Sequence, residues 1–263
     1  MLSRYVLPSV AFVIAFAILC GLGFWQVQRL AWKQALIARV EARFGLDPVP
    51  LPPGEVWSEP DFIDRFEYRP VALTGAFVPV PESDGRFERF YVYTLLSEPR
   101  GPRGGQGYWV MNLFQPDGGG LVYVNRGFIE FNAREREAPP PEGQVTLTGV
   151  VRDSSTGSSF TPPCEHATTT CYVANTEFAA RMIGEADVAP FYIDMRADGI
   201  AGAPAGVETA GADPTALVPQ GGETRIAFTN SHLQYAVTWF GLAASLLGVF
   251  AVFMAGRFRG RSA

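Results

Sequence analysis

Histidine and cysteine are scarce in this chain, and their scarcity narrows the chemistry that the protein can perform. The 263 residues include 2 histidines and 3 cysteines. The sequence lacks a nucleophile elbow, a Walker loop, a dinucleotide-binding fingerprint and a paired-histidine zinc motif. Nucleophilic catalysis needs a histidine or an equivalent base beside the nucleophile. We therefore expect no catalytic residues and no enzymatic activity.

Basic residues are too few and too dispersed to form a nucleic-acid-binding surface. The formal net charge is −5, and the sequence contains no long basic tract. Nucleic-acid binding depends on lysines and arginines that neutralise phosphates. Nucleic acid is therefore not an expected partner.

Charge is almost missing from two long apolar stretches, one near each end of the chain. The first lies within 1–28, where Arg4 is the only charged residue. In the second, within 229–256, His232 and Tyr235 are the only titratable side chains. Each stretch exceeds the roughly 20 residues that cross a bilayer core, so both are predicted transmembrane helices in contact with lipid. A cleaved signal peptide is the alternative for the first stretch, but no small-x-small cleavage site follows it.

Two spans place both termini on the same side of the membrane. The tail 257–263 carries three arginines and no acidic residue, which predicts a cytoplasmic location by the positive-inside rule. Basic residues after the first span argue the other way: Arg29, Lys33, Arg39 and Arg43. Because a large domain is translocated despite such charges, we favour a central domain on the outer side.

The region 29–66 is predicted to contain a juxtamembrane helix and a linker. Helix-forming residues continue after the first span, either as an extension of that helix or as an amphipathic segment along the surface. Prolines then break the helix between 48 and 53.

The region 67–197 has the pattern of a β-rich domain. Glycines between β-forming runs at 115–120 predict a hairpin, and Asn175 and Gly184 frame a predicted helix. The six predicted strands cover 68–77, 89–96, 107–114, 121–129, 144–152 and 190–195. These elements predict an α+β domain with a mainly antiparallel, barrel-like sheet, flanked by the two transmembrane helices. The Gly-, Ala- and Pro-rich stretch 198–228 is expected to be a flexible loop that buries little.

Two features of the central domain have more than one interpretation. Cys164 and Cys171 favour a disulfide that closes a short loop, although a metal site with His166 is the alternative. Arg126 follows a run of β-forming residues, so we expect it to bind backbone carbonyls or a carboxylate, with a partner-binding role as the alternative.

His232 is predicted to lie in the first turn of the second membrane helix. "SHLQ" fits a capping box with Ser231 as the cap and Gln234 reaching back. The helix dipole disfavours a charged imidazole there, and a neutral imidazole offers a lone pair to iron. The alternative is a capping or interfacial role for His232, with interfacial anchoring for Trp25, Tyr235 and Trp239.

Small residues recur along another face of the second span and predict a packing seam for the first span, whose Ala17 and Gly21 are also small. The seam consists of Gly241, Ala244, Gly248, Ala251 and Ala255. The face with His232, Ala236 and Trp239 would then remain open to a ligand.

The sequence resembles the Surfeit-locus family of cytochrome c oxidase assembly proteins over nearly its whole length. The stretches that carry the resemblance are "GFWQVQRLAWKQALI" and "NSHLQYAVTWFGLA", with "YRPVALTGAF", "GYWVMNLF", "VYVNRGF" and "PFYIDM" in order between them. The disulfide loop and the Gly/Ala-rich stretch are not family hallmarks.

The resemblance implies an assembly factor that transiently binds haem a and aids its insertion into oxidase subunit I. It also implies that His232 is the axial ligand of the haem iron. The other expected haem contacts at family motif positions are Trp25, Gln26, Arg29, Tyr235 and Trp239. We expect the macrocycle to lie between the helices, with Arg29 near the propionates.

Subunit I is the expected partner, and haem a synthase is a further one. The expected location is a bacterial inner membrane, with the domain in the periplasm, since no Arg-rich transit peptide precedes the first span. Two rival functions remain: a scaffold for subunit I that does not bind haem, and a membrane-anchored enzyme or copper carrier.

Overall fold

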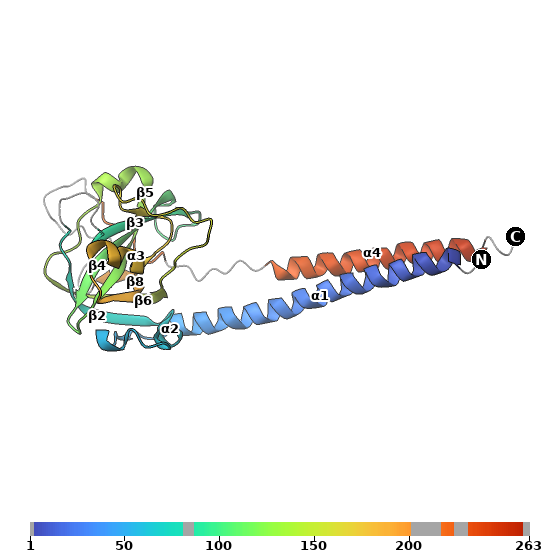
Figure 1. Cartoon of the computed structure of the whole chain (residues 1–263), viewed down its shortest axis with the longest axis horizontal. Helices are drawn as coiled ribbons and strands as arrows, with labels where there is room; N and C mark the ends of the chain where they lie inside the picture. The colour runs from blue at the N-terminus through green and yellow to red at the C-terminus, as the bar shows by residue number, and fades with distance from the viewer. Residues whose placement is uncertain (1–2, 81–86, 201–216, 224–230, 260–263) are drawn as a thin grey trace. The chain divides into compact units, whose positions relative to one another are not determined.

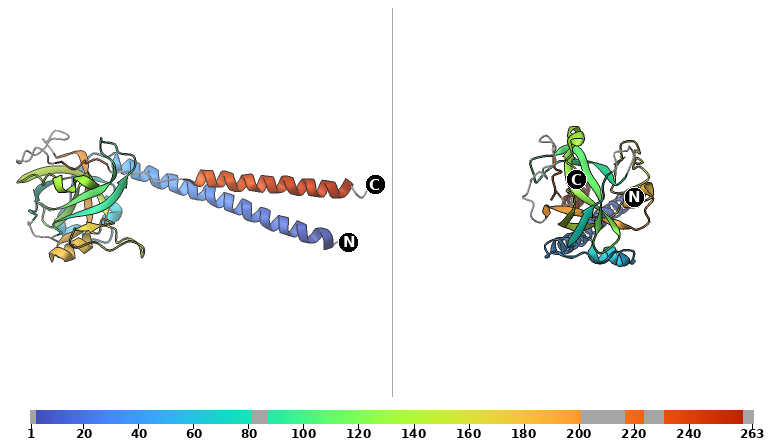
Figure 2. Two further views of the ribbon diagram at one scale, coloured as in Figure 1. Left: turned by 90° about the horizontal axis from the view of Figure 1, so that it is seen from above. Right: turned by 90° about the vertical axis from the view of Figure 1, so that its left-hand side faces the viewer.

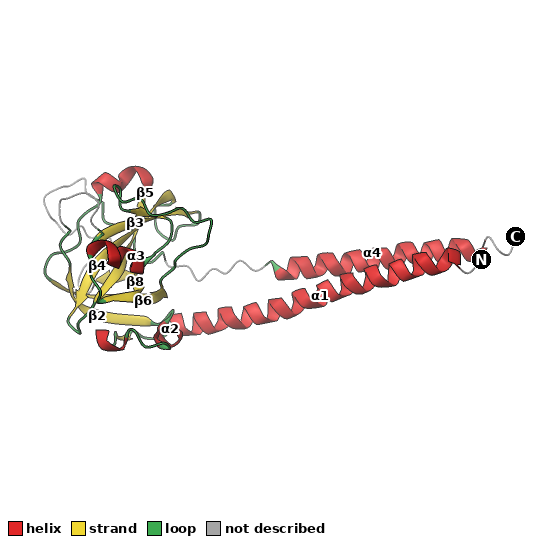
Figure 3. Cartoon of the chain, viewed as in Figure 1, coloured by secondary structure: helices red, strands yellow, loops and turns green. Residues whose placement is uncertain are grey.

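The computed structural model describes residues 3–80, 87–200, 217–223 and 231–259. The chain forms two compact units, one built from 1–41 and 226–263 and the other from 42–225. The first unit contains two long helices and the second contains a curved sheet with short helices, as Figure 3 shows. This architecture confirms the predicted fold class of two apolar terminal helices flanking an α+β domain.

Both terminal helices are long and apolar enough to cross a membrane. Helix α1 (Ser3–Phe44) has a most apolar window of mean hydropathy 2.4, and helix α4 (His232–Arg259) has one of 2.0. Helix α1 continues without a break past the predicted membrane boundary at residue 28. The segment after the first span is therefore an extension of the helix, which is the first of the two alternatives.

Helices α1 and α4 are antiparallel neighbours that pack through aromatic and small side chains (Figure 1). The ring of Phe12 stacks on Phe250 with centroids 4.0 Å apart. A Cβ placed on Gly23 would lie 2.8 Å from the ring of Phe240, so this glycine permits the close approach. Ala236 and Ala243 are buried in the same contact.

The predicted packing seam on α4 is wrong. All of its small residues are exposed: Gly241, Ala244, Gly248, Ala251 and Ala255. No atom beyond the local helix lies within 4 Å of a Cβ placed on Gly21, Gly241 or Gly248. The His232 face contacts α1 instead, because its phenylalanines interlock with α1 and bury more surface than glycines would.

The second unit contains a β-barrel with mostly antiparallel strands (Figures 1 and 2). Five strands close the ring in the order β2–β6–β8–β5–β4 and back to β2, and β5 with β8 is its one parallel pair. These strands are β2 (Pro70–Phe77), β4 (Gly105–Pro116), β5 (Leu121–Glu130), β6 (Gln144–Asp153) and β8 (Val188–Ile200). Strand β3 (Arg89–Leu96) extends the sheet beside β4. All six predicted strands and the hairpin between β4 and β5 are confirmed.

Two further strands and two 3₁₀ helices were not predicted, because they are too short to show a periodic pattern. The strands are β1 (Val49–Pro50) and β7 (Thr170–Cys171), and the 3₁₀ helices are η1 (Gly54–Val56) and η2 (Phe131–Arg136). The predicted helix at 175–184 is α3 (Thr176–Ile183). Asn175 accepts a hydrogen bond from the amide of Phe178, and Gly184 ends the helix at φ 77°.

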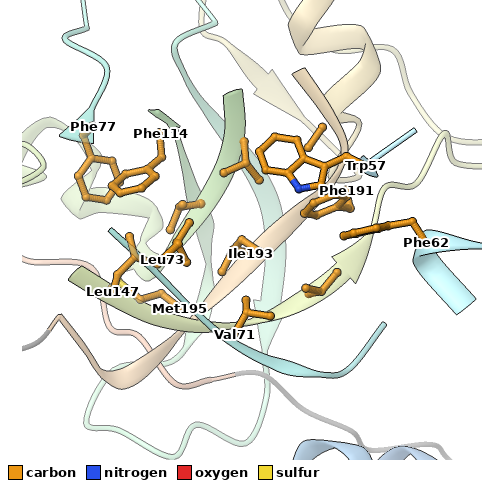
Figure 4. Packing of buried hydrophobic residues seen from close by; sticks show 14 residues of the cluster. Trp57, Phe62, Val71, Leu73, Phe77, Phe114, Leu147, Phe191, Ile193 and Met195 are labelled. Carbon is orange, nitrogen blue, oxygen red and sulfur yellow. The ribbon is translucent and has the colours of Figure 1, made fainter. Parts of the chain in front are cut away.

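The barrel interior is filled by aliphatic and aromatic side chains, as Figure 4 shows. At one end, Trp57 and Phe62 pack against Phe191, with Phe62 supplied by the short helix α2 (Phe62–Phe66). The indole N–H of Trp57 donates to the carbonyl of Pro52, 2.8 Å away. The proline-rich linker is thereby attached to the core.

Part of the stretch predicted to bury little, 198–228, packs tightly on the barrel. Strand β8 continues to Ile200, and Gln220 exchanges two backbone hydrogen bonds with Phe128 in β5. Glu223 is 3% exposed and accepts hydrogen bonds from the amides of Arg100 and Gly101. The expectation is therefore wrong for 217–223, where polar groups find barrel partners that composition does not reveal. The rest of the predicted loop, 201–216 and 224–228, lies outside the described part of the chain.

Gly127 permits this attachment, and we expect Gly127→Ala to disrupt it. Gly127 has φ 130°, and a Cβ there would lie 2.3 Å from the carbonyl group of Gln220. Backbone strain alone costs about 1–3 kcal/mol, and the clash adds to it. Chemical denaturation should show that Gly127→Ala lowers the free energy of unfolding more than Gly143→Ala does. Gly143 also has a positive φ, 76°, but has open space around it. Equal losses would contradict a role for the close approach.

Candidate functional site

We call the unit that contains α1 and α4 the membrane unit. Its most distinctive polar contact joins these two apolar helices. Nδ1 of His232 lies 2.7 Å from Oε1 of Gln26. Gln26 is 8% exposed, and His232 is half-buried at the first position of α4. A direct side-chain bond between two apolar helices fixes both their register and the orientation of the imidazole.

The hydrogen bond also selects the tautomer of the imidazole. An amide oxygen only accepts, so Nδ1 of His232 donates and carries the proton. The lone pair of a neutral imidazole is then on Nε2. Metal-binding histidines commonly have this arrangement, in which a neighbouring acceptor orients the ring and increases its basicity.

Three other predicted site residues lie on one side of this polar pair. In an α-helix each residue is rotated by about 100° around the helix axis from the residue before it. By this rule, Trp25 and Arg29 are rotated from Gln26 around the axis of α1 in the same sense as Tyr235 is rotated from His232 around the axis of α4. Offsets of equal sense fall on the same side of an antiparallel helix pair. Gly23 and Phe240, offset in the opposite sense, meet on the other side. We call the first side the Tyr235 flank.

The Tyr235 flank presents aromatic surface and one cation. Trp25 is 54% exposed and Tyr235 is 52% exposed. The guanidinium of Arg29 lies 4.1 Å from the ring centroid of Trp32. Trp239 is half-buried on α4, about one turn beyond Tyr235.

Beside His232, the two helices are in direct contact. The direct bond between His232 and Gln26 and the contact of Gly23 with Phe240 fill the space at this level. The expectation of a macrocycle between the helices stays a prediction, and it would require these contacts to separate. The exposed surface next to His232 is the Tyr235 flank.

An apolar groove of about 380 Å³ lies further along the same helix pair, toward the chain termini. It is lined by Pro8, Ala11, Phe12, Ala15, Leu246, Val249, Phe250 and Phe253. The sequence does not predict this groove, because its position depends on which faces of α1 and α4 pack together.

Cys164 and Cys171 are joined by a disulfide, with their Cα atoms 4.2 Å apart. The thiolates that the alternative metal site requires are therefore not present. His166 is exposed on this loop, and its ring contacts Phe87 and Phe178. Among the described residues, no cluster of three or more potential metal ligands is found.

Arg126 binds both of the predicted kinds of acceptor and has a structural role. It donates to the carboxylate of Glu137 at 2.8 Å and to the carbonyls of Ala138 and Pro139. The hydroxyl of Tyr91 donates to the same carboxylate at 2.6 Å. Burial lowers the pKa of Arg126, which Glu137 opposes, and burial next to Glu137 raises the pKa of Tyr91 above its usual range. This network holds the segment after η2 against the barrel.

The fold and the polar pair define a class: a membrane protein with two spanning helices and a β-barrel domain inserted between them. A sequence profile of the SURF1 family matches residues 13–244. Surfeit locus protein 1 of Homo sapiens is 34% identical over 238 residues, which cover 86% of this chain and 70% of the human protein. The Mus musculus protein of the same name is 34% identical over 237 residues, covering 86% and 68%. The SURF1-like protein of Monosiga brevicollis is 30% identical over 240 residues, covering 87% and 80%. The chain belongs to the SURF1 family.

Proposed function

We propose that this protein is an assembly factor for cytochrome c oxidase that binds haem a and presents it to subunit I. Membership of the SURF1 family implies the role in oxidase assembly. The observation that supports haem binding is the hydrogen bond between His232 and Gln26 at the rim of the membrane unit. It gives an oriented imidazole at the start of an apolar helix.

The residues of the Tyr235 flank suit a porphyrin cargo. His232 would hold the haem iron through Nε2, and Trp25 and Tyr235 would offer exposed aromatic surface to the macrocycle. Arg29 would bind the propionates, since guanidinium binds carboxylate through paired hydrogen bonds. A cargo on an exposed flank, held by one protein ligand, is accessible to an acceptor. This arrangement favours direct transfer to a partner in the same membrane.

The disulfide supports a location of the barrel on the outer side of the membrane. Disulfides persist in oxidising compartments and are rare in the cytosol. We propose a bacterial inner membrane with the barrel in the periplasm and both chain termini on the cytoplasmic side. Haem a synthase is proposed as a second partner, as the source of the cargo.

The exposed small residues of α4 favour a second candidate function. Gly241, Ala244 and Gly248 face away from α1, and small residues permit close contact with another membrane helix. A scaffold that binds subunit I through this face would not need haem. Protein purified from cells that make haem a separates the two functions: the carrier has a haem spectrum, and the scaffold is colourless.

We expect Gln26→Leu to weaken haem binding without removing the axial ligand. Leucine cannot accept the proton of Nδ1, so the imidazole loses its fixed tautomer and orientation. Loss of such a partner typically lowers metal affinity by about 10–100-fold. Haem titration of the detergent-solubilised full chain measures the change.

The matched control is Gln28→Leu, which makes the same replacement at an exposed position of α1. Gln28→Leu should bind haem like the wild type. Unchanged affinity in Gln26→Leu would show that the hydrogen bond does not prepare His232 for iron.

A further inference from the structure

The apolar groove lies on the same flank of the helix pair as Trp25 and Tyr235. Pro8 precedes Gln26, and Phe250 follows His232, by about five full turns, so both lie in line with the polar pair. Ala11 and Ala15 are offset from Gln26 in the same sense as Trp25. Three more groove residues are offset from His232 in the same sense as Tyr235: Leu246, Val249 and Phe253. The eighth, Phe12, is rotated slightly in the opposite sense and stacks on Phe250.

Apolar side chains connect the polar pair to the groove along this flank. Ile18 on α1 and Leu242 on α4 have the same offsets as the groove residues and are 55% and 48% exposed. At about 1.5 Å per residue, the groove begins about 21 Å from His232, at Leu246. Cys20 and Ser245 lie outside this strip. Thr238 lies at its edge, with its hydroxyl bonded to the carbonyl of Gln234 in the same helix, and the strip from Trp25 to the groove is otherwise apolar.

We propose that this strip and groove hold the long isoprenoid tail of the haem whose iron binds His232. This inference rests on the proposed function. Haem a carries its isoprenoid tail and its propionates on roughly opposite edges of the macrocycle. With the propionates near Arg29 at the membrane rim, the tail is directed along the Tyr235 flank toward Ala15 and Leu246. An extended isoprenoid tail added to the radius of the macrocycle has a reach of the same order as the distance to the groove.

The tail provides selectivity for haem a over haem b, which has no such tail. Because lipid chains are as apolar as leucine, the preference comes from close packing in a shaped groove and not from the hydrophobic effect. We therefore expect a moderate preference, about tenfold in affinity, for a groove of this kind. The binding of haem b depends on His232 and not on the groove.

The test compares haem a with haem b on the full chain in lipid nanodiscs. Wild type should bind haem a about tenfold more tightly than haem b. Ala15→Phe, which fills the groove, should reduce this ratio to about one without changing the affinity for haem b. Ala11→Leu, a smaller filling of the same groove, should act in the same direction. The control Ala17→Phe makes the same replacement at an exposed position of α1 outside the groove and should keep the wild-type ratio.

The outcomes separate this inference from the function on which it rests. Equal wild-type affinities for the two haems, or full preference retained in Ala15→Phe, would overturn the role of the groove while haem binding through His232 stands. Binding of both haems that is insensitive to His232→Ala would overturn the proposed function itself.

Discussion

Replacing His232 with alanine is expected to abolish stable haem binding by the purified protein. The substitution removes the axial ligand, so the affinity should fall by more than the roughly 10–100-fold that loss of a supporting partner costs. The visible spectrum of bound haem should be lost together with the affinity. Haem content per protein and the visible spectrum, measured after co-expression with haem a biosynthesis, give the result.

The chain provides a matched control for this substitution. His166 lies exposed on the disulfide loop of the β-barrel unit, and His166→Ala also removes an imidazole. It should leave haem content and spectrum unchanged. Wild-type haem content in His232→Ala would refute the ligand role, and loss in both variants would point to a general effect on the protein.

The second large effect is expected on stability, from Glu137→Ala in the barrel. Its carboxylate is 1% exposed and lies 2.8 Å from Arg126, whose side chain is 4% exposed. Arg89 is 3.4 Å from the same carboxylate. Removing the carboxylate leaves the Arg126 charge buried without its counter-ion, which costs about 3–5 kcal/mol in comparable pairs. Denaturant unfolding of the full chain in detergent, followed by tryptophan fluorescence, measures the loss.

Two further variants serve as comparisons for Glu137→Ala. Glu177→Ala removes an exposed ion pair to Arg181 within α3 and should cost no more than about 0.5 kcal/mol. The double variant Arg126→Met/Glu137→Leu should lose less free energy of unfolding than Glu137→Ala, since it also removes the buried charge of Arg126 and leaves only the partly exposed Arg89 without this partner. If Glu137→Ala and Glu177→Ala lower the free energy of unfolding equally, the buried network around Glu137 does not have a central role in stability.

Most of the barrel could be predicted from sequence because each of its strands has its own local signal. Alternating β-formers predict β3 over the whole range that the structure shows, and Asn175 and Gly184 predict both ends of α3. The closure of the ring between β2 and β4 and the burial of Gln220 depend on pairing between distant segments. Local patterns do not encode that pairing.

The site was predictable as a set of residues but not as an arrangement. The family motif indicates His232 and Gln26 separately, and the hydrogen bond between them appears only when the two helices are brought together. Helical periodicity correctly separated two faces of α4, but it did not indicate which of them contacts α1. Small residues and aromatic residues both favour helix packing, and the choice depends on the partner helix.

The attachment of 217–223 to the barrel has a consequence for how the chain tolerates change. Strand β8 up to Ile200 and the backbone bonds of Gln220 fix both ends of the intervening stretch to the same domain. Additions or deletions inside that stretch are therefore insulated from the second span, and the length of chain leading to His232 stays constant. An epitope or a fluorophore is best placed between Ile200 and Gln220, because both flanking segments are held by the same domain and the chain from Glu223 to His232 keeps its length.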